Sequence, residues 1–292
     1  MDIFLQVLFS GLTVGAMYAA GSISLSLLWS SMGMLNLANS SFIAIGGYAA
    51  YFCMTILGAS WVFAIPLAIV SGAVAGYLFY HLVVRWLFVR PDFAINIIIS
   101  TVAVAALVEN VILNAFGPEA RRQPFQIPGG MPIGGAFLPF QTLLTLVMAM
   151  LLLALVLWIM KRTRTGLVIR AVAQQRDAAQ LMGIDVSSSF ARAMMLAATV
   201  GTVSGVLVTA STQLFPATGF DATVKALVIC IIAGLGNIRA SILMAFVLGI
   251  FEIAIQYIFG QRFGFPAMLG LVIVVLIVSP VGLFGKQTVT RV

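Results

Sequence analysis

The sequence of 292 residues is 62% hydrophobic and only 8% charged, with a mean hydropathy of +1.15. A soluble domain of this length has no core large enough for so many apolar side chains, so the composition excludes a soluble protein and predicts a chain that crosses a membrane several times. The net charge of +7 would suggest nucleic-acid binding in a soluble protein, but here the basic residues stand at the ends of apolar stretches, where they orient a membrane chain.

The predicted fold is all-α, a polytopic transmembrane helical bundle of about eight to nine spans with a short cytoplasmic coupling-helix segment. Residues 1–292 are expected to form a single transmembrane domain, because apolar segments use most of the chain. Cys53 and Cys230 lie in apolar runs without metal-type spacing and are expected to pack as small hydrophobic residues. His81 stands near the end of a span, where an interfacial aromatic residue is the simplest interpretation, so no catalytic histidine is expected.

The first predicted span, Ile3 to Trp29, has no basic region before it, so we expect it to remain in the mature protein instead of being cleaved as a signal peptide. The stretch after it, Ser30 to Phe42, is polar but uncharged and contains Asn36, Asn39 and Ser40. Uncharged polar backbone between spans predicts a bend or a discontinuous helix buried in the bundle. Its side chains either line a translocation path or form a buried structural turn.

The next spans are expected at Phe42 to Leu57, Trp61 to about Val84, and Phe93 to Phe116. One helical face of the last of these is polar and would be rejected by lipid; it comprises Asn96, Ser100, Asn110 and Asn114. Glu109 lies beside this face, either as a functional carboxyl in the membrane or as one that reaches the interface. The loop that follows, Gly117 to Pro139, is rich in proline and glycine and is expected to be irregular and to form an external docking surface.

The long polar segment from Lys161 to Arg192 lies between two apolar spans. Its basic residues mark it as cytoplasmic by the positive-inside rule; they are Lys161, Arg162, Arg164, Arg170, Arg176 and Arg192. Apolar residues recur at helical spacing between Thr165 and Met182, and Gly183 is suited to close a helix. We therefore predict one or two short helices across the cytoplasmic face, which rest on a partner protein or on anionic lipid.

The C-terminal third begins with a predicted span from Phe190 to about Thr212 and an external turn from Gln213 to Thr223. The apolar piece from Val224 to Leu235 is too short to span comfortably, so it is either a short span or a re-entrant segment. Lys225 at its start either reaches the interface or binds a substrate carboxylate.

Two further spans complete the chain, Ser241 to Phe259, which carries Glu252 and Gln256 one turn apart, and Phe263 to Phe284. Nine spans would place the N-terminus outside and the C-terminus inside. The expected cytoplasmic basic residues are then those of the polar segment with Arg85, Arg90, Arg239, Lys286 and Arg291. The external ones are Arg121, Arg122, Lys225 and Arg262.

The run Asp177-Ala178-Ala179 followed by Gly183 resembles the coupling motif EAA-x-x-x-G of ABC-importer permeases. Further motifs in order along nearly the whole chain resemble the permeases of high-affinity branched-chain amino-acid importers. They are Gly33 to Ala38 with Gly46-Gly47-Tyr48, Asn110, the run Gly166 to Val186, Lys225-Ala226 with Gly234-Leu235-Gly236, and Pro280 to Gly285.

The resemblance implies a non-catalytic permease subunit of the bacterial cytoplasmic (inner) membrane. Its implied partners are a second permease subunit in a heterodimer, two cytoplasmic ATPase subunits and an external solute-binding protein, with membrane lipid around it and no nucleic acid. ATP and Mg would be bound by the partner subunits, and this chain would hold no cofactor and no metal. The implied ATPase coupling residues are Arg170, Asp177, Ala178, Ala179 and Gly183.

The chain departs from the family pattern at Leu37-Ala38-Asn39-Ser40, where Phe-Ala-His-Gly is usual, at Glu109, where Gln is usual, and at Arg239-Ala240, where Pro-Gly is usual. The expected substrates are therefore branched-chain or related hydrophobic amino acids, with urea, short amides or aromatic acids as the alternative. An ion-coupled secondary carrier is the alternative of another class, but it would not explain the coupling motif. An enzyme would need more convergent titratable groups than the membrane segments offer.

The expected translocation path comprises Asn36, Asn39, Ser40, Asn96, Glu109, Asn110 and Lys225. A carboxylate inside a span must be protonated, paired or wetted. Glu109 lies about two turns of helix before Phe116, so we expect it at the outer mouth, either wetted or paired with Lys225. In that place it would disfavour anionic substrates.

Overall fold

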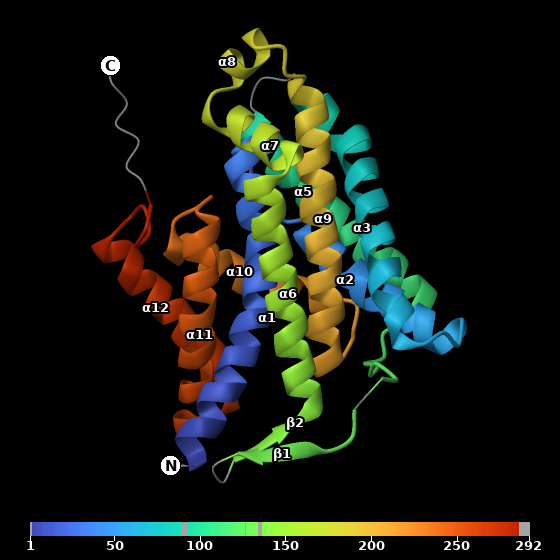
Figure 1. Ribbon diagram of the computed structural model, residues 1–292, viewed down its shortest axis with the longest axis vertical. Helices are drawn as coiled ribbons and strands as arrows, with labels where there is room; N and C mark the ends of the chain where they lie inside the picture. Colours follow the sequence, from blue (N-terminus) through green and yellow to red (C-terminus); the bar gives the residue numbers. More distant parts are fainter. Residues whose placement is uncertain (1, 89–92, 126, 134–135, 286–292) are drawn as a thin grey trace.

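The computed structural model describes residues 2–88, 93–125, 127–133 and 136–285. The chain is an elongated helical bundle with a small β-hairpin at one end and two short helices at the other, as Figure 1 shows. Within the described residues, seven helical stretches are long and apolar enough to cross a membrane. The predicted all-α polytopic bundle is confirmed.

The long helices are packed roughly along the long axis of the molecule (Figure 1). They are α1 (Asp2–Met32), α3 (Ala64–Phe79) with its continuation into α4 (Arg85–Leu87), α5 (Phe93–Phe116), α6 (Phe140–Arg162), α9 (Val186–Ser211), α11 (Ile238–Phe259) and α12 (Gly264–Val278). Two shorter helices, α2 (Asn39–Tyr51) and α10 (Thr218–Ala233), bring the bundle to the nine segments expected. Most residues of α2 and α10 are buried, so protein rather than lipid surrounds them and neither has to match the bilayer thickness.

Helix α9 is the centre of the bundle, with 67% of its apolar window buried, against 17% for α5 and α12. It packs against α1, α2 and α3. The contact with α2 is a backbone-to-backbone approach, because a Cβ on Gly46 would overlap the carbonyl of Thr202 and a Cβ on Gly205 would overlap that of Ile43. Without a hydrophobic driving force between helices in lipid, such close packing is a main source of their association.

Helix α10 begins earlier than the sequence indicated. The predicted external turn, Gln213 to Thr223, is wrong in its second half, because the helix starts at Thr218. Its far end reaches the end of the bundle that carries the polar segment, where Leu235 lines a cavity together with Arg170. Of the two alternatives for Val224 to Leu235, the structure therefore supports a short span that crosses the bundle.

We call the end of the bundle with the polar segment the coupling end, and the opposite end, with the hairpin, the outer end. The first described residue, Asp2, lies at the outer end, and Gly285 lines a cavity at the coupling end (Figure 1). The placement of these residues at opposite ends agrees with an odd number of spans, and which end faces the cytoplasm stays a prediction. Among the basic residues used for that orientation, Arg90, Lys286 and Arg291 lie outside the described residues.

The outer loop is more ordered than its composition indicated. It contains an antiparallel hairpin of β1 (Gly130–Ile133) and β2 (Ala136–Pro139). Arg121 pairs through its backbone with Leu214, and the Gln123 amide donates to the carbonyl of Gly47 at 2.9 Å. The loop is thus fixed across the ends of α2 and α9.

The glycine contacts predict opposite effects on the melting temperature for two glycine-to-alanine substitutions, one in α9 and one in α12. Gly205→Ala should lower the apparent melting temperature of the purified protein, because the added methyl meets the backbone of α2 and overpacking costs about 1–3 kcal/mol. Gly270→Ala in α12 should leave it equal or higher, since nothing lies within 4 Å of the added methyl and alanine is favoured in helices by about 1 kcal/mol. Equal effects of the two variants would contradict the close α2–α9 contact.

Candidate functional site

The polar segment folds into two short helices, α7 (Arg164–Gln174) and α8 (Arg176–Leu181), as predicted. Thr163 caps α7 by accepting a hydrogen bond from the N–H of Gly166 at 3.2 Å. Gly183 ends α8 with a φ of 80°, in the left-handed region that favours glycine at a helix C-terminus. Asp185 then caps α9 by accepting from the N–H groups of Ser187 and Ser188. Local sequence signals therefore define this whole segment.

Arg176 fastens α8 to the bundle. Its guanidinium donates to the carbonyl of Met32 at 2.6 Å, at the C-terminal end of α1, and lies 5.0 Å from the ring centre of Phe88 and 5.3 Å from that of Phe190. A cation is favoured both at a helix C-terminus and over aromatic faces. The sequence offered no signal that would pair Arg176 with these distant residues. The contacts connect α8 to α1, to the chain after α4 and to α9.

The C-terminal end of α8 forms an exposed apolar tip of Leu181 and Met182, which are 88% and 82% exposed. In Figure 1 α8 is the part of the chain that projects farthest at the coupling end. Large apolar side chains on a projection that is predicted to lie in the cytoplasm indicate an interaction site. Sequence reasoning placed both residues in the helical stripe and did not single them out as contact residues.

The predicted coupling residues divide into two groups around this tip. Asp177, Ala178 and Gly183 are exposed on α8 and its C-terminus, and Arg170 is exposed on α7, where its Nε donates to the carbonyl of Gly166. Ala179 is only 5% exposed and packs against the bundle, so its side chain supports α8 from beneath.

The polar bend before α2 is buried and hydrogen-bonded within the chain. Asn36 and Asn39 are fully buried. The Oδ1 of Asn36 accepts from the N–H of Ala38 at 3.0 Å, and the Oδ1 of Asn39 accepts from the hydroxyl of Ser24 at 2.6 Å. Because both amides have protein partners, this geometry favours the structural turn. The assignment of these residues to the path stays a prediction.

The polar face of α5 points away from the chain's own bundle. Asn110 and Asn114 are exposed, and each side-chain amide donates only to a carbonyl one turn earlier in α5. On the opposite side of the same helix Ile97, Thr101 and Ile112 are buried. Asn96 is half-buried on the same face as the exposed amides. Polar side chains on the outer surface of a membrane helix predict a protein neighbour or a water-filled path there.

Glu109 lies at the edge of this face and lines a small cavity of about 10 Å³ with Ser40 and Phe220. Its predicted pairing with Lys225 is wrong. The ammonium of Lys225 forms an ion pair with Glu252 at 2.8 Å and donates to the hydroxyl of Tyr18 at 2.6 Å. The physical reason is the packing, because α10 packs against α1, α2 and α11, and Lys225 lies on the side of α1 and α11, where Tyr18 and Glu252 stand. Glu109 lies on α5, which packs against α2.

Glu252 is the acceptor at the centre of this polar cluster. It is 2% exposed and accepts from Lys225, from the Tyr18 hydroxyl at 2.5 Å and from the Gln256 amide at 3.1 Å. The cluster borders a cavity of about 330 Å³ in the outer half, which Asp221 also lines. Burying a carboxylate is tolerated when it is paired and its oxygens are bonded, and here both oxygens are.

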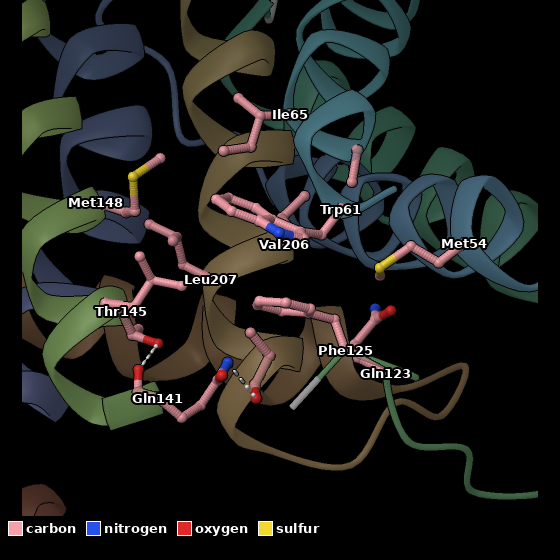
Figure 2. Close-up of a pocket in the computed structure, with 13 residues that line it drawn as sticks. Met54, Trp61, Ile65, Gln123, Phe125, Gln141, Thr145, Met148, Val206 and Leu207 are labelled. Carbon is pink, nitrogen blue, oxygen red and sulfur yellow. Dashed lines mark hydrogen bonds between the residues drawn. The ribbon is translucent and has the colours of Figure 1, made fainter. Parts of the chain in front are cut away.

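A second cavity at the outer end is apolar and much smaller, about 60 Å³, between α3, α6 and α9. Figure 2 shows Trp61 and Phe125 beside each other over this cavity, and their rings stack with centres 5.0 Å apart. Gln123 and Gln141 lie at its lower edge in Figure 2. The cavity offers little space and no charge, so it is a packing feature beneath the outer loop. Among the described residues, no group of three or more side chains that could hold a metal ion occurs.

Comparison with known proteins shows which family the chain matches. Residues 7–279 match the family model described as the permease component of the branched-chain amino acid transport system. The chain is 26% identical to the high-affinity branched-chain amino acid transport system permease protein BraD of Pseudomonas aeruginosa, over 99% of this chain and 98% of that protein. It is 25% identical to the permease protein LivH of Salmonella typhimurium, over 99% and 98% of the two chains.

The likeness also extends to an archaeal protein and to a solved structure. The probable branched-chain amino acid transport permease protein LivH of Methanocaldococcus jannaschii is 25% identical over 90% of this chain and 87% of its own. A structure of PsaBC from Streptococcus pneumoniae in complex with Fab superposes with a TM-score of 0.52 at 15% identity, covering 94% of this chain and 91% of that one. At that identity the likeness concerns the fold alone.

The polar cluster generates the prediction for this site. Lys225→Met leaves the buried Glu252 carboxylate without its counter-ion and should destabilise the protein by about 3 kcal/mol, measured as a lower melting temperature in detergent. The double variant Lys225→Met/Glu252→Gln should recover most of that loss, because neither charge then remains buried and unpaired. Arg262→Met, at an exposed position of the outer end, is the control and should change little. Additive losses in the double variant would contradict the pairing.

Proposed function

The chain belongs to the family of permease components of branched-chain amino acid transport systems, and on this premise we propose that it is the membrane-spanning subunit of an ATP-driven importer for branched-chain or related hydrophobic amino acids. It is a multi-pass protein of the inner membrane. Its relatives are named as transport components, and we assign this chain the same non-catalytic role. ATP and Mg would be bound by partner subunits.

The observation that carries this proposal is the exposed tip of Leu181 and Met182 on a segment fixed to the bundle. An ATPase subunit that changes shape can move the spans only through a rigid element in contact with both. The segment from α7 to α8 has such contacts, because Arg176 ties it to α1 and α9. A partner would bury this exposed apolar pair. Burial would stabilise the complex by about 1.5–3 kcal/mol for each side chain. An ion-coupled carrier has no ATPase subunit that would bind such a tip.

The same reasoning assigns a second permease subunit to the face of α5. Asn110 and Asn114 are exposed on a helix that has few contacts within its own chain. A facing subunit would cover these amides and enclose a path between the two chains, with Glu109 at its edge. A path lined by amides with one carboxylate suits a zwitterion better than an anion. The external solute-binding protein would deliver the substrate at the outer end, where the hairpin and the loop tied to α2 lie.

The tip can be tested directly. Leu181→Asp should release the ATPase subunits from the purified permease and abolish uptake of labelled leucine, because a charge replaces the side chain that the partner buries. Gln175→Glu adds the same charge at an exposed cap position of α8 and keeps the apolar tip, so it should retain both subunits and transport. Normal co-purification of the ATPase with Leu181→Asp would refute this docking site.

The α5 face is tested by photo-crosslinking in membranes. A benzophenone amino acid in place of Asn114 should give a crosslinked product with a second permease subunit, because this position faces away from its own bundle. The same amino acid in place of Ile277 of α12, which is 77% exposed, should instead react with lipid. A subunit crosslink from position 277 but not from position 114 would place the interface on α12 and contradict the proposal.

A further inference from the structure

A cavity of about 570 Å³ lies at the coupling end, beside helix α7. We call it the basic cavity. Four parts of the chain form its walls: the end of α6, helix α7, the turn between α10 and α11, and the C-terminal segment at Phe284 and Gly285. In Figure 1 α7 lies above the top of α6, and the turn between α10 and α11 and the C-terminal segment lie to its left.

Three cationic side chains line the basic cavity: Lys161, Arg170 and Arg239. No acidic residue is among its described lining residues, and no carboxylate of the described chain forms an ion pair with any of the three. Arg239 stands in the first turn of α11, where the helix dipole already contributes positive charge. Three like charges and a helix N-terminus around one space are mutually repulsive, and an anion in that space would relieve the repulsion.

The rest of the lining is mixed, with the polar side chains of Ser30, Gln174 and Asn237 beside a larger apolar part. Leu157 and Met160 come from α6 on the membrane side, Ile169 from α7, and Phe284 from the C-terminal segment. A free phosphate or a nucleotide would leave these side chains unused. A molecule with an anionic phosphate at one end and a hydrocarbon chain at the other would satisfy both parts of the cavity.

The position of the cavity along the bundle agrees with such a molecule. Lys161 lies in the last turn of α6 and Arg239 in the first turn of α11, so both charges stand where a membrane helix meets the headgroup region on the predicted cytoplasmic side. Basic pockets between helices on this side of a membrane are suited to anionic lipid headgroups. We propose that the basic cavity binds the phosphate headgroup of an anionic phospholipid, with the first part of an acyl chain along Leu157 and Met160.

A lipid in this place would connect α7 with the start of α11, which have few direct contacts with one another. Within the chain, the C-terminal segment is held to the α10–α11 region by the hydrogen bonds from Leu283 to Ile232 at 2.8 Å and from Asn237 to Phe284 at 3.3 Å. The basic side chain of Arg170 approaches the same space from α7. One phosphate group would bridge α7 to the start of α11.

The experiment measures lipid retention by native mass spectrometry on the chain purified together with its co-purifying subunits. The protein is titrated with phosphatidylglycerol and, separately, with zwitterionic phosphatidylcholine. Phosphatidylglycerol should bind the unaltered protein in preference to phosphatidylcholine. The double variant Lys161→Gln/Arg239→Gln should weaken phosphatidylglycerol binding by about 25-fold, since each cation near a membrane surface contributes about fivefold.

The matched control is Arg162→Gln/Arg192→Gln. It removes the same charge from exposed residues of the same polar segment that do not line the basic cavity, and it should leave binding nearly unchanged. Melting temperatures of both variants show whether folding has been altered, and Lys161→Arg/Arg239→Lys, which keeps both charges, should restore binding.

Three results would overturn the proposal. An equal loss in the control variant would show that surface charge alone attracts the lipid. Displacement of phosphatidylglycerol by millimolar inorganic phosphate would show a free-phosphate site. Lipid that binds only after the ATPase subunits have been stripped away would show that a partner protein fills the cavity.

Discussion

Close contact between helix backbones is the constraint on which this structure depends. Gly249 of α11 meets the backbone of α1 at Gly15, and the glycines of α3 at 72 and 76 meet the backbone of α9. Inside a bilayer the lipid chains are as apolar as leucine, so packing at such glycines, rather than exclusion of water, holds helices together. The helices in these contacts, α1, α2, α3, α9 and α11, form the rigid centre of the chain, and the functional features lie at its ends and on its outer faces.

The ends of this centre are joined to the coupling segment by a few specific interactions. Arg176 links α8 to the last carbonyl of α1, and Thr163, Gly183 and Asp185 define where the short helices begin and end. At the neighbouring corner, glycines of two distant motifs pack together, because a Cβ on Gly282 would lie 2.6 Å from the backbone N of Gly234. Under the proposed function, these contacts would let a partner subunit that binds α8 move the spans.

Polar side chains of the membrane helices have two different environments. Asn39 and Glu252, which face the chain's own helices, are buried and hydrogen-bonded. Those of α5 that face outward, Asn110 and Asn114, are exposed. The cost of polar groups in lipid explains the contrast, since the first set completes the fold of one chain and the second set predicts a protein neighbour or a water-filled path.

The sequence by itself determined the class of protein, the approximate spans and the two short helices of the polar segment. Composition, the positions of basic residues and local helix signals such as Gly183 depend only on neighbouring residues, and the motifs predicted the family. Only the tertiary structure decided which carboxylate pairs with Lys225, where α10 begins, and that Asn36 and Asn39 are bonded within the chain. The sequence suggested Glu109 as a partner of Lys225, whereas the partner in the structure is Glu252, because the pairing depends on which helices are neighbours. Helix neighbours are set by how side chains and glycines of distant segments fit together, and no local pattern in one segment contains that information.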